Sequence, residues 1–491
     1  MGITILLSLY TTRLILNGLG ASDFGIYNLV GGSIAMLGFL NTAMASATQR
    51  FMSYAEGAGD TEKKITIFNI SLVLHFVSSI LVGLLLLIAG LIFFNGFLDV
   101  PEERIFAAKI IYACLIISTM FSVMTVPYDA VMNAHENMKY YALIGIFESI
   151  LKLIVAIVCI YTTSDKLVVY GILMSIIPFV TLTIMRYYCH NKYSECRIKI
   201  RKSWDKVLAK KMISFAGWNL IGTSTSMIGN YGLNIVINNF FGVVLNAVVG
   251  ITSQLCGIIV TFSSNMLKAL NPVITKTEGA GERDKMLQLS STGNKMSFII
   301  LSIISMPLLI ETNYILKLWL VNIPEWTVLF VKLQIIRGLA EQLTFVYHTS
   351  INAHGNIRTY NIIISIVNII PIVLTYLLFS LGAEPYIMYI ITISVFGIFV
   401  SGLRVYFMHQ NCGLSYYNYI RKELLPLIVS TICCLVLCYH VTFLSTNNIF
   451  RLILVILTST IGGGICYYIF TFNSSEKLII KRIIIGIVKR R

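Results

Sequence analysis

The sequence predicts an all-α protein that crosses a membrane many times. Of its 491 residues, 57% are hydrophobic and only 12% are charged, and its mean hydropathy is +0.81. Soluble proteins carry about 25% charged residues, and a membrane-spanning helix needs about 20 apolar residues. Such runs follow one another along the whole chain, and backbone polar groups in lipid need internal partners, so the spans are helices. The short alternating segments of a transmembrane barrel are missing from the sequence.

Hydropathy and run length predict about fourteen spans. The first is a short stub, and the second is rich in small residues ("GGSIAMLGFLNTAMASA"), which allows close helix packing. In order, the predicted spans are residues 1–17, 24–47, 66–94, 107–131, 141–162, 167–188, 212–238, 244–270, 294–314, 326–352, 359–381, 385–408, 423–444 and 449–472.

Basic residues alternate by loop. Loops after odd-numbered spans carry little more than Arg104, Lys166 and Lys317. Loops after even-numbered spans carry many more, among them Lys63, Lys64, Lys139, Lys199, Lys285, Lys295 and Arg421. By the positive-inside rule, the even loops and both termini are predicted to be cytoplasmic. This topology accounts for the net charge of +15, whereas nucleic-acid binding would not explain the alternation, so no nucleic-acid partner is expected.

One connection and the C-terminal tail are long enough to have a role of their own. Residues 189–211 form a basic segment centred on "SWDKVLAKKM", which is either a helix lying on anionic lipid or a plain linker. The end of the chain, "SSEKLIIKRIIIGIVKRR", has the same basic amphipathic character. All non-cytoplasmic loops are short, so no folded external domain is expected.

Two short motifs occur twice. "NAHENMKYY" begins at Asn133 and "NAHGNIRTY" at Asn352, with five of nine residues identical and an offset of 219. "EGAGDTEK" begins at Glu56 and "EGAGERDK" at Glu278, with an offset of 222. Both pairs fall in equivalent loops, after spans two and eight and after spans four and ten. The repeat unit is therefore six helices, and an even number returns the chain to the same side, so the two copies are predicted to be parallel.

This repeat predicts the domain organisation. A first six-helix bundle covers residues 1–188, the basic cytoplasmic linker covers 189–211, and a second bundle covers 212–408. Residues 409–491 hold helices thirteen and fourteen and the basic cytoplasmic tail. Span seven is about ten residues longer than span one, so we expect a truncated first helix or missing residues before Met1. No signal peptide is recognised at the N-terminus.

Several segments resemble the oligosaccharide flippases of O-antigen and capsule export, in the multidrug/oligosaccharidyl-lipid/polysaccharide exporter superfamily. They are "SLYTTRLILNGLGASDFGIYNLVGG" (8–32), "NTAMASATQRFMSYAEGAGD" (41–60), "FGVVLNAVVGITSQL" (241–255) and "ILKLWLVNIP" (315–324). The resemblance implies two six-helix bundles in a V around a central cavity, plus two extra helices. It implies a transporter of the bacterial inner membrane that moves a polyprenyl-diphosphate-linked oligosaccharide by alternating access, with other polysaccharide-assembly proteins and membrane lipids as partners.

Two charged pairs lie inside predicted spans, where an ionisable residue costs roughly 2.5–3.5 kcal/mol and needs a reason. Glu148 and Lys152 in span five, and Arg337 and Glu341 in span ten, each have i, i+4 spacing that places both side chains on one helix face. Each pair either neutralises itself or lines a substrate cavity. The repeat aligns Glu148 and Lys152 with apolar Val367 and Pro371, so this pair is not part of the duplicated scaffold.

Three further cations are candidates for holding a diphosphate: Arg13 in span one, Arg50 at the end of span two and Lys268 late in span eight. For Arg50 and Lys268, snorkelling to the cytoplasmic surface is an equal alternative.

Ion coupling is assigned to Glu148 and Asp129, although Asp129 taken alone is better explained as a satisfied interior or interface polar group. His75 and His348 are also titratable, but each is better explained as a satisfied interior polar group.

No enzyme, cofactor or metal site is predicted. The sequence contains no phosphate-binding loop, dinucleotide fingerprint or nucleophile elbow, and its ten cysteines are scattered. The "CHNKYSEC" stretch fits no zinc spacing, and the repeat explains the match of His135 and His354 without chemistry. A drug or cation exporter of the same superfamily is the main alternative. A membrane glycan polymerase or glycosyltransferase is disfavoured by the short outer loops.

Overall fold

The computed structural model describes residues 2–35, 38–94, 101–199, 203–320, 322–444, 447–473 and 476–477. The described part is almost entirely helical, which confirms the predicted fold class. Ten helical segments in it are long and apolar enough to cross a membrane. The chain divides into two compact units, Met1–Thr223 and Ser224–Arg491, and the boundary falls inside one long helix.

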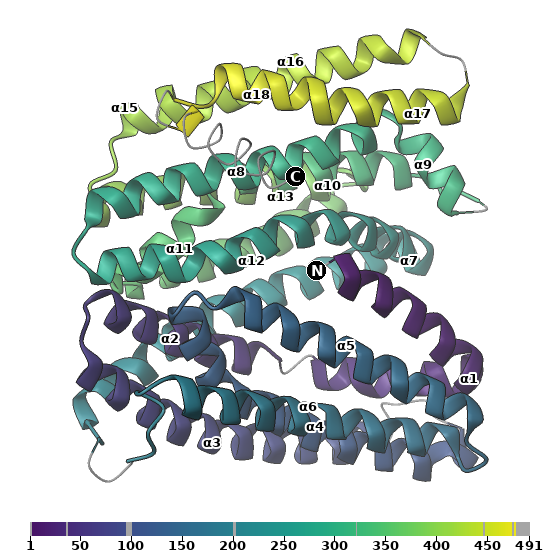
Figure 1. Ribbon diagram of the computed structural model, residues 1–491. Coiled ribbons are helices and arrows are strands. Elements are labelled where there is room, and N and C mark those ends of the chain that lie inside the picture. Colours follow the sequence, from purple (N-terminus) through teal and green to yellow (C-terminus); the bar gives the residue numbers. More distant parts are fainter. Residues whose placement is uncertain are drawn as a thin grey trace, which may run out of the picture. The chain divides into compact units, whose positions relative to one another are not determined.

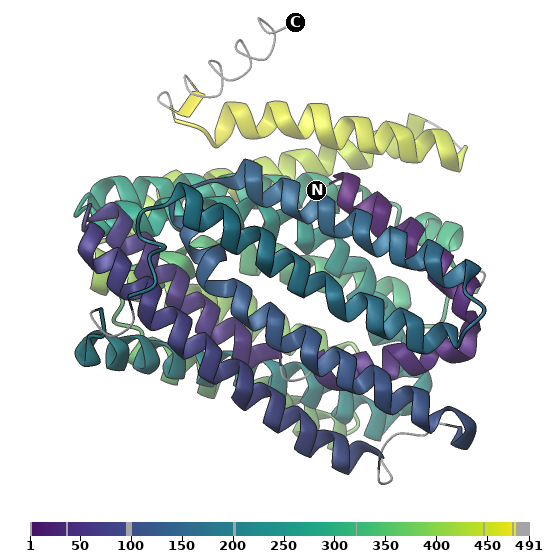
Figure 2. The same ribbon diagram turned by 60° about the horizontal axis from the view of Figure 1, so that its bottom comes forward.

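Unit 1 is a helical bundle whose core is made by helices that are distant in sequence. Helix α4 packs against both α6 and α3, and α1 packs against α5 (Figures 1 and 2). The core between them includes Val30, Ile111, Ala156 and Leu167, all fully buried. The helices are α1 (Gly2–Ala35), α2 (Gly38–Gly57), α3 (Thr61–Ile92), η2 (Glu102–Arg104), α4 (Ile105–Ala134), α5 (Met138–Tyr161), α6 (Lys166–Lys192) and the start of α7 (Lys206–Gly279).

Polar side chains at helix starts explain where these helices begin. Asp60, Asn137, Asp165 and Asp205 each accept a hydrogen bond from a backbone N–H in the first turn of α3, α5, α6 and α7, respectively. The first N–H groups of a helix have no partner within the helix, so such caps stabilise the start and set the boundary.

Unit 2 is built around α8 (Arg283–Ile310). The most apolar 18-residue stretch of α8 is 61% buried, whereas that of the last span, Asn448–Phe470, is only 17% buried. Helices α16 and α17 pack along α8, which attaches the last two spans to the rest of unit 2 (Figure 1). The other helices are α9 (Thr312–Trp319), α10 (Thr327–Gln342), α11 (Phe345–His354), α12 (Arg358–Ser380), α13 (Ile387–Thr392), α14 (Ser401–Cys412), α15 (Tyr416–Tyr419), α16 (Leu425–Val441), α17 (Asn448–Leu457) and α18 (Gly463–Phe470).

Several spans of unit 2 are less regular than hydropathy predicts. The predicted span 326–352 is two helices, α10 and α11, separated by Leu343 and Thr344. The last three spans each contain a π-helical segment: η3 (Ile393–Val400), η4 (Ile420–Leu424) and η6 (Thr458–Gly462). Hydropathy registers only length and polarity, so it cannot detect a local change of helical hydrogen bonding.

The backbone carries the same repeat as the sequence. Gly20 and Gly242, which are 222 residues apart, break α1 and α7 with nearly identical torsion angles (φ 81°, ψ 165° and φ 79°, ψ −177°). Gly59 and Gly281 are the last residues of the two EGAG turns, with φ of 68° and 77°. Glu136 and Gly355, 219 residues apart in the two NAH turns, have φ of 55° and 94°. The duplicated motifs are therefore duplicated turns.

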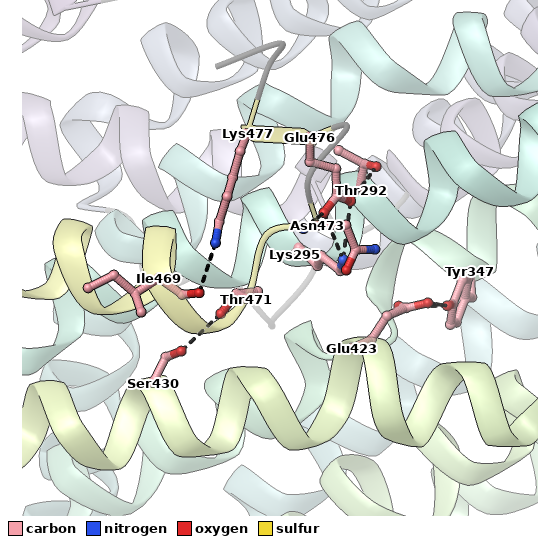
Figure 3. Close-up of polar contacts among 10 residues, drawn as sticks. All are labelled: Thr292, Lys295, Tyr347, Glu423, Ser430, Ile469, Thr471, Asn473, Glu476 and Lys477. Carbon is pink, nitrogen blue, oxygen red and sulfur yellow. Dashed lines mark hydrogen bonds and ion pairs between the residues drawn. The ribbon is translucent and has the colours of Figure 1, made fainter. Parts of the chain in front are cut away.

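A buried polar network joins the end of the chain to α8 (Figure 3). The Lys295 ammonium lies 3.1 Å from both carboxylate oxygens of Glu476, and these side chains are only 1% and 9% exposed. Thr292 donates a hydrogen bond to the same carboxylate. Nearby, the Tyr347 hydroxyl contacts both oxygens of Glu423 at 2.7 Å. Lys295 was expected in a cytoplasmic loop, and its burial inside α8 corrects that expectation.

The two glycine breaks lead to a first prediction. Torsion angles with positive φ and ψ near 180° are accessible essentially to glycine alone, so Gly20→Ala and Gly242→Ala should each cost about 1–3 kcal/mol. Among the residues that the structure describes, no neighbouring atom lies within 4 Å of the added methyl at either position, so the cost is backbone strain. Thermal unfolding in detergent micelles measures it.

The matched controls are Gly25→Ala and Gly250→Ala, which lie in the same helices at uncrowded helical positions. These changes should be neutral or stabilise by about 0.5–1 kcal/mol. Equal effects at all four positions would show that the breaks are not strained.

The Lys295–Glu476 pair leads to a second prediction. Lys295→Met leaves the Glu476 carboxylate buried without its cation and should cost roughly 3 kcal/mol. Adding Glu476→Gln to Lys295→Met removes that charge and should restore part of the loss, which unfolding measurements on the two single variants and the double variant will show. If the effects of the single variants simply add, the pair is not coupled.

Candidate functional site

In unit 1, the two repeated motifs meet around His135. The His135 Nδ1 atom lies 3.4 Å from Oε1 of Glu56 in the EGAG turn, and Nε2 contacts Oε1 of Glu195, which follows α6. Lys64 at the start of α3 contacts the other oxygen of Glu56 at 2.7 Å. We call Glu56, Lys64, His135 and Glu195 the His135 cluster. It ties three connections of the bundle together at one end of unit 1.

The His135 ring is placed between two carboxylates and stacks on Tyr193, with ring centroids 4.3 Å apart. Glu195 is almost fully buried, with 3% of its side chain exposed. Burial raises the pKa of this carboxyl, but the hydrogen bond to His135, a backbone hydrogen bond and the charges of His135 and Lys64 together outweigh burial and hold the pKa below its ordinary value. Because the pKa of Glu195 is lower in the folded protein than its ordinary value, this contact stabilises the fold at pH values above the ordinary carboxyl pKa. That stabilisation is lost as the pH falls through the lowered pKa.

Unit 2 repeats this arrangement with a different partner. His354 Nδ1 lies 3.5 Å from Oε1 of Glu278, the counterpart of Glu56. The guanidinium of Arg283 contacts the Glu278 carboxylate, and its Nη2 lies 3.1 Å from His354 Nδ1. Since arginine can only donate, His354 accepts through Nδ1. The two histidines at equivalent positions therefore differ in their second partner, which is a carboxylate for His135 in unit 1 and a guanidinium for His354 in unit 2.

The His135 cluster also has the donor atoms of a metal site. The ligand atoms of Glu56, His135 and Glu195 lie within 4.8 Å of one another, and they form the one such group in the part of the chain that the structure describes. However, the two ring nitrogens of His135 face different carboxylates, and Lys64 already neutralises Glu56. A metal would need one nitrogen and both carboxylates directed to one point, so the geometry favours an ion-pair cluster. The His135 cluster could not be predicted from sequence spacing, because Glu195 lies outside the two repeated motifs.

Arg50 lies in a pocket of about 560 Å³ between α2, the start of α3 and the start of α7. Its guanidinium carbon is 4.7, 5.0 and 5.5 Å from the ring centroids of Phe51, Tyr54 and Phe215. Lys63 and Lys211 also line the pocket.

Three acidic residues line this pocket as well: Asp60, Glu62 and Asp205. Asp60 and Asp205 accept hydrogen bonds from the first N–H groups of α3 and α7. Two of the three carboxylates are thus engaged as helix caps, beside three cations.

The two predicted i, i+4 pairs are formed. Glu148 and Lys152 are 2.7 Å apart and remain 37% and 43% exposed. Arg337 and Glu341 are also 2.7 Å apart and less exposed, and Arg337 lies over the Phe396 ring at 4.6 Å. The second pair lines a small cavity of about 90 Å³ inside unit 2.

The other predicted site residues are dispersed. Lys268 is exposed on α7, and Asp129 is half-buried in α4. The side chain of Arg13 lies outside the described residues, although its backbone belongs to α1. His75 contacts the Thr48 hydroxyl at 3.0 Å, and His348 lies 3.1 Å from both Tyr360 and Asn352. Both histidines are interior polar groups with hydrogen-bond partners.

Ion pairs between distant residues were not predicted. Arg104 contacts both Asp23 and Asp165, at 2.5 and 2.7 Å. Arg451 contacts Glu311 through two nitrogen–oxygen pairs, at 2.5 and 2.8 Å. The partners are 61 to 140 residues apart, so no local spacing reveals them.

The two histidines give a third prediction. His135→Phe keeps an aromatic ring on Tyr193 but leaves the buried Glu195 carboxylate without its donor, and should cost roughly 3 kcal/mol. His354→Phe should cost about 1 kcal/mol or less, because Arg283 still neutralises Glu278. Chemical unfolding in mild detergent, followed by circular dichroism, compares the two. Equal losses would contradict the assigned difference between the clusters.

Comparison with known proteins supports the fold. A family model described as MatE matches residues 1–158. An outward-facing multidrug resistance MATE family transporter of the MOP superfamily superposes with a TM-score of 0.70 at 14% identity, covering 84% of this chain and 93% of that one. The MATE transporter ClbM in complex with Rb⁺ gives 0.65 at 14% identity, covering 86% and 94%.

A MOP superfamily transporter from Pyrococcus furiosus, for which a reversed polarity of the binding pocket suggests a different function, gives 0.54 at 14% identity, covering 94% and 92%. A search of curated protein sequences finds no match. The chain therefore has the fold of the MATE transporters of the MOP superfamily.

Proposed function

We propose that this protein is a transporter that flips lipid-diphosphate-linked oligosaccharide across the bacterial cytoplasmic membrane by alternating access, for the assembly of surface polysaccharide. Its likeness in fold to MATE and MOP superfamily transporters supports transport rather than enzymatic catalysis. The flippase-like segments at residues 8–32 and 41–60 support the choice of cargo. The polyprenyl chain stays in the bilayer, and the protein handles the charged headgroup.

The observation that carries the proposal is how four acidic groups in the helices or at their ends are engaged. Glu148, Glu311 and Glu341 each contact a lysine or arginine within the same unit. Asp23 contacts Arg104. Two other acids of the spans differ, because Glu423 contacts the Tyr347 hydroxyl and Asp129 is half-buried in α4. A site for a cation needs a carboxylate with free coordination positions, and these four carboxylates are neutralised by protein cations. The arrangement therefore suits an anionic cargo better than a cationic one.

Arg50 is the group best suited to the diphosphate. A guanidinium binds phosphate oxygens with two parallel hydrogen bonds, and stacking on aromatic rings fixes its plane. Its pocket of about 560 Å³ also contains Lys63 and Lys211, together with the three acids named above, of which Asp60 and Asp205 already accept hydrogen bonds from helix N–H groups. Under the positive-inside topology this pocket lies at the cytoplasmic end of unit 1, where the cargo is made.

An ion-coupled drug or cation exporter is the second candidate. The favouring observations are the described Rb⁺ complex of ClbM and the multidrug resistance transporter with the same fold. In this chain, Asp129 is the half-buried acid that would serve cation coupling. The transporter described with reversed pocket polarity is a precedent for this fold with a different function.

The fourth prediction tests Arg50 in cells. In a strain that lacks the chromosomal gene, Arg50→Gln should reduce surface glycan at least tenfold. Arg50→Lys keeps the positive charge but cannot form the two parallel hydrogen bonds of a guanidinium, so it should retain part of the surface glycan. Immunoblots of glycan, normalised to protein level in the membrane, provide the readout. Arg186→Gln, an exposed arginine of the same unit, is the matched control and should export normally.

Wild-type export by both Arg50 variants at normal protein levels would remove Arg50 from the proposal. Unchanged surface glycan in the deletion strain, together with new sensitivity to cationic drugs, would favour the exporter instead.

A further inference from the structure

Unit 2 contains a second large pocket, of about 790 Å³, that none of the preceding functions uses. It lies where the C-terminal end of α8 meets α9 and α10, and it is closed on its other side by α16 and α17. The last two helices belong to the part of the chain that is not duplicated. Helices α16 and α17 therefore give this pocket a wall that the duplicated part of the chain does not supply.

The charges lining this pocket do not balance. Arg451 is neutralised by Glu311 through the two contacts described above. Lys317 and Lys332 also line the pocket, and neither forms an ion pair with any of the described residues. The lining thus contains three basic groups and one acid, a local excess of two positive charges.

Lys317 is unusual for its position in the topology. It follows span nine, on the side of the membrane where the chain has few basic residues. Arg104, another of those few, is held between Asp23 and Asp165. Lys317 instead faces a pocket, so its charge is available to a ligand.

Lys332 lies in the first half of α10, within the predicted span 326–352. It follows the helix start at Thr327 by five residues, or about 8 Å along the axis. Helical side chains tilt toward the N-terminus, so the Lys332 stem runs toward the same end of unit 2 as Lys317.

The walls of the pocket are amphipathic. Leu309, Ile336, Leu435 and Phe443 provide an apolar side, and Asn313 and Asn448 provide hydrogen-bonding groups beside the lysines. Tyr439 and Phe443 are 55% and 72% exposed, as expected for aromatic residues at the depth of lipid headgroups. A free anion would leave the apolar side of the pocket unfilled, whereas a lipid satisfies both sides.

We propose that this pocket binds an anionic glycerophospholipid of the outer leaflet. Lys317 and Lys332 bind its phosphate, Asn313 and Asn448 hydrogen-bond to its glycerol headgroup, and its acyl chains lie along the apolar wall formed by α8, α10 and α16. The bound lipid fills the space between the repeated unit and its two added helices. The proposal does not depend on which cargo the protein transports.

The fifth prediction concerns lipid retained on purification. Native mass spectrometry of the full-length protein should show phosphatidylglycerol carried through mild detergent, and Lys317→Gln/Lys332→Gln should lower its occupancy about tenfold or more. Lys317→Arg/Lys332→Arg preserves the charge and should retain the lipid. Lys285→Gln/Lys422→Gln, which removes two exposed lysines from the other end of the unit, is the control.

A second measurement separates lipid from free anion. Thermal unfolding in phosphatidylcholine nanodiscs should shift upward when phosphatidylglycerol is included, and inorganic phosphate alone should produce no shift. The shift should disappear in the Gln variant; if that variant does not fold, Lys317→Gln alone carries the test, since Lys317 is exposed.

Equal lipid occupancy in the Gln variant and wild type would overturn the proposal. A shift with inorganic phosphate as large as that with phosphatidylglycerol would also overturn it, in favour of a soluble anion. Loss of lipid in the control variant would show that retention is not specific to this pocket.

Discussion

Within the helical bundles of this protein, a charged side chain is tolerated where a partner compensates its loss of water. Placing an ion in a low-dielectric interior costs several kcal/mol, and a well-placed opposite charge offsets that cost. Lys295 meets Glu476 at the end of the chain, Arg451 meets Glu311 between α17 and α8, and Arg104 joins Asp23 to Asp165. These contacts connect segments far apart in sequence, so the same constraint that pairs the charges also fixes which helices are neighbours.

The duplicated turns show that the same backbone turn can be combined with different charge partners in the two units. The backbone of the EGAG and NAH turns is preserved in both units, and in each unit a histidine of the second turn lies within 3.5 Å of a glutamate of the first. The third partner differs, being Glu195 in unit 1 and Arg283 in unit 2. Turn geometry is thus maintained while the local charge changes. Repeated histidines alone are therefore no evidence of shared chemistry.

Much of the fold could be predicted from the sequence, because a span of about 20 apolar residues and an i, i+4 charge pair are local properties. The pairs Glu148–Lys152 and Arg337–Glu341 form as expected. The positions that were missed depend on contacts between helices. Lys295 looked like a loop residue because a lysine near a span end usually faces water, and its partner Glu476 lies 181 residues away. Glu195 and the pocket between α8 and α17 follow from three-dimensional neighbours that periodicity cannot reveal.

The fold and the paired acids support the central proposal that the cargo is an anionic glycolipid. The most direct test uses the purified protein in liposomes that contain a fluorescent polyprenyl-diphosphate oligosaccharide. A membrane-impermeant quencher then reports the fraction of label in the outer leaflet over time. The account predicts protein-dependent loss of the protected fraction, strongly slowed by Arg50→Gln. Transport of a cationic drug in exchange for sodium or protons, with no movement of the glycolipid, would contradict it.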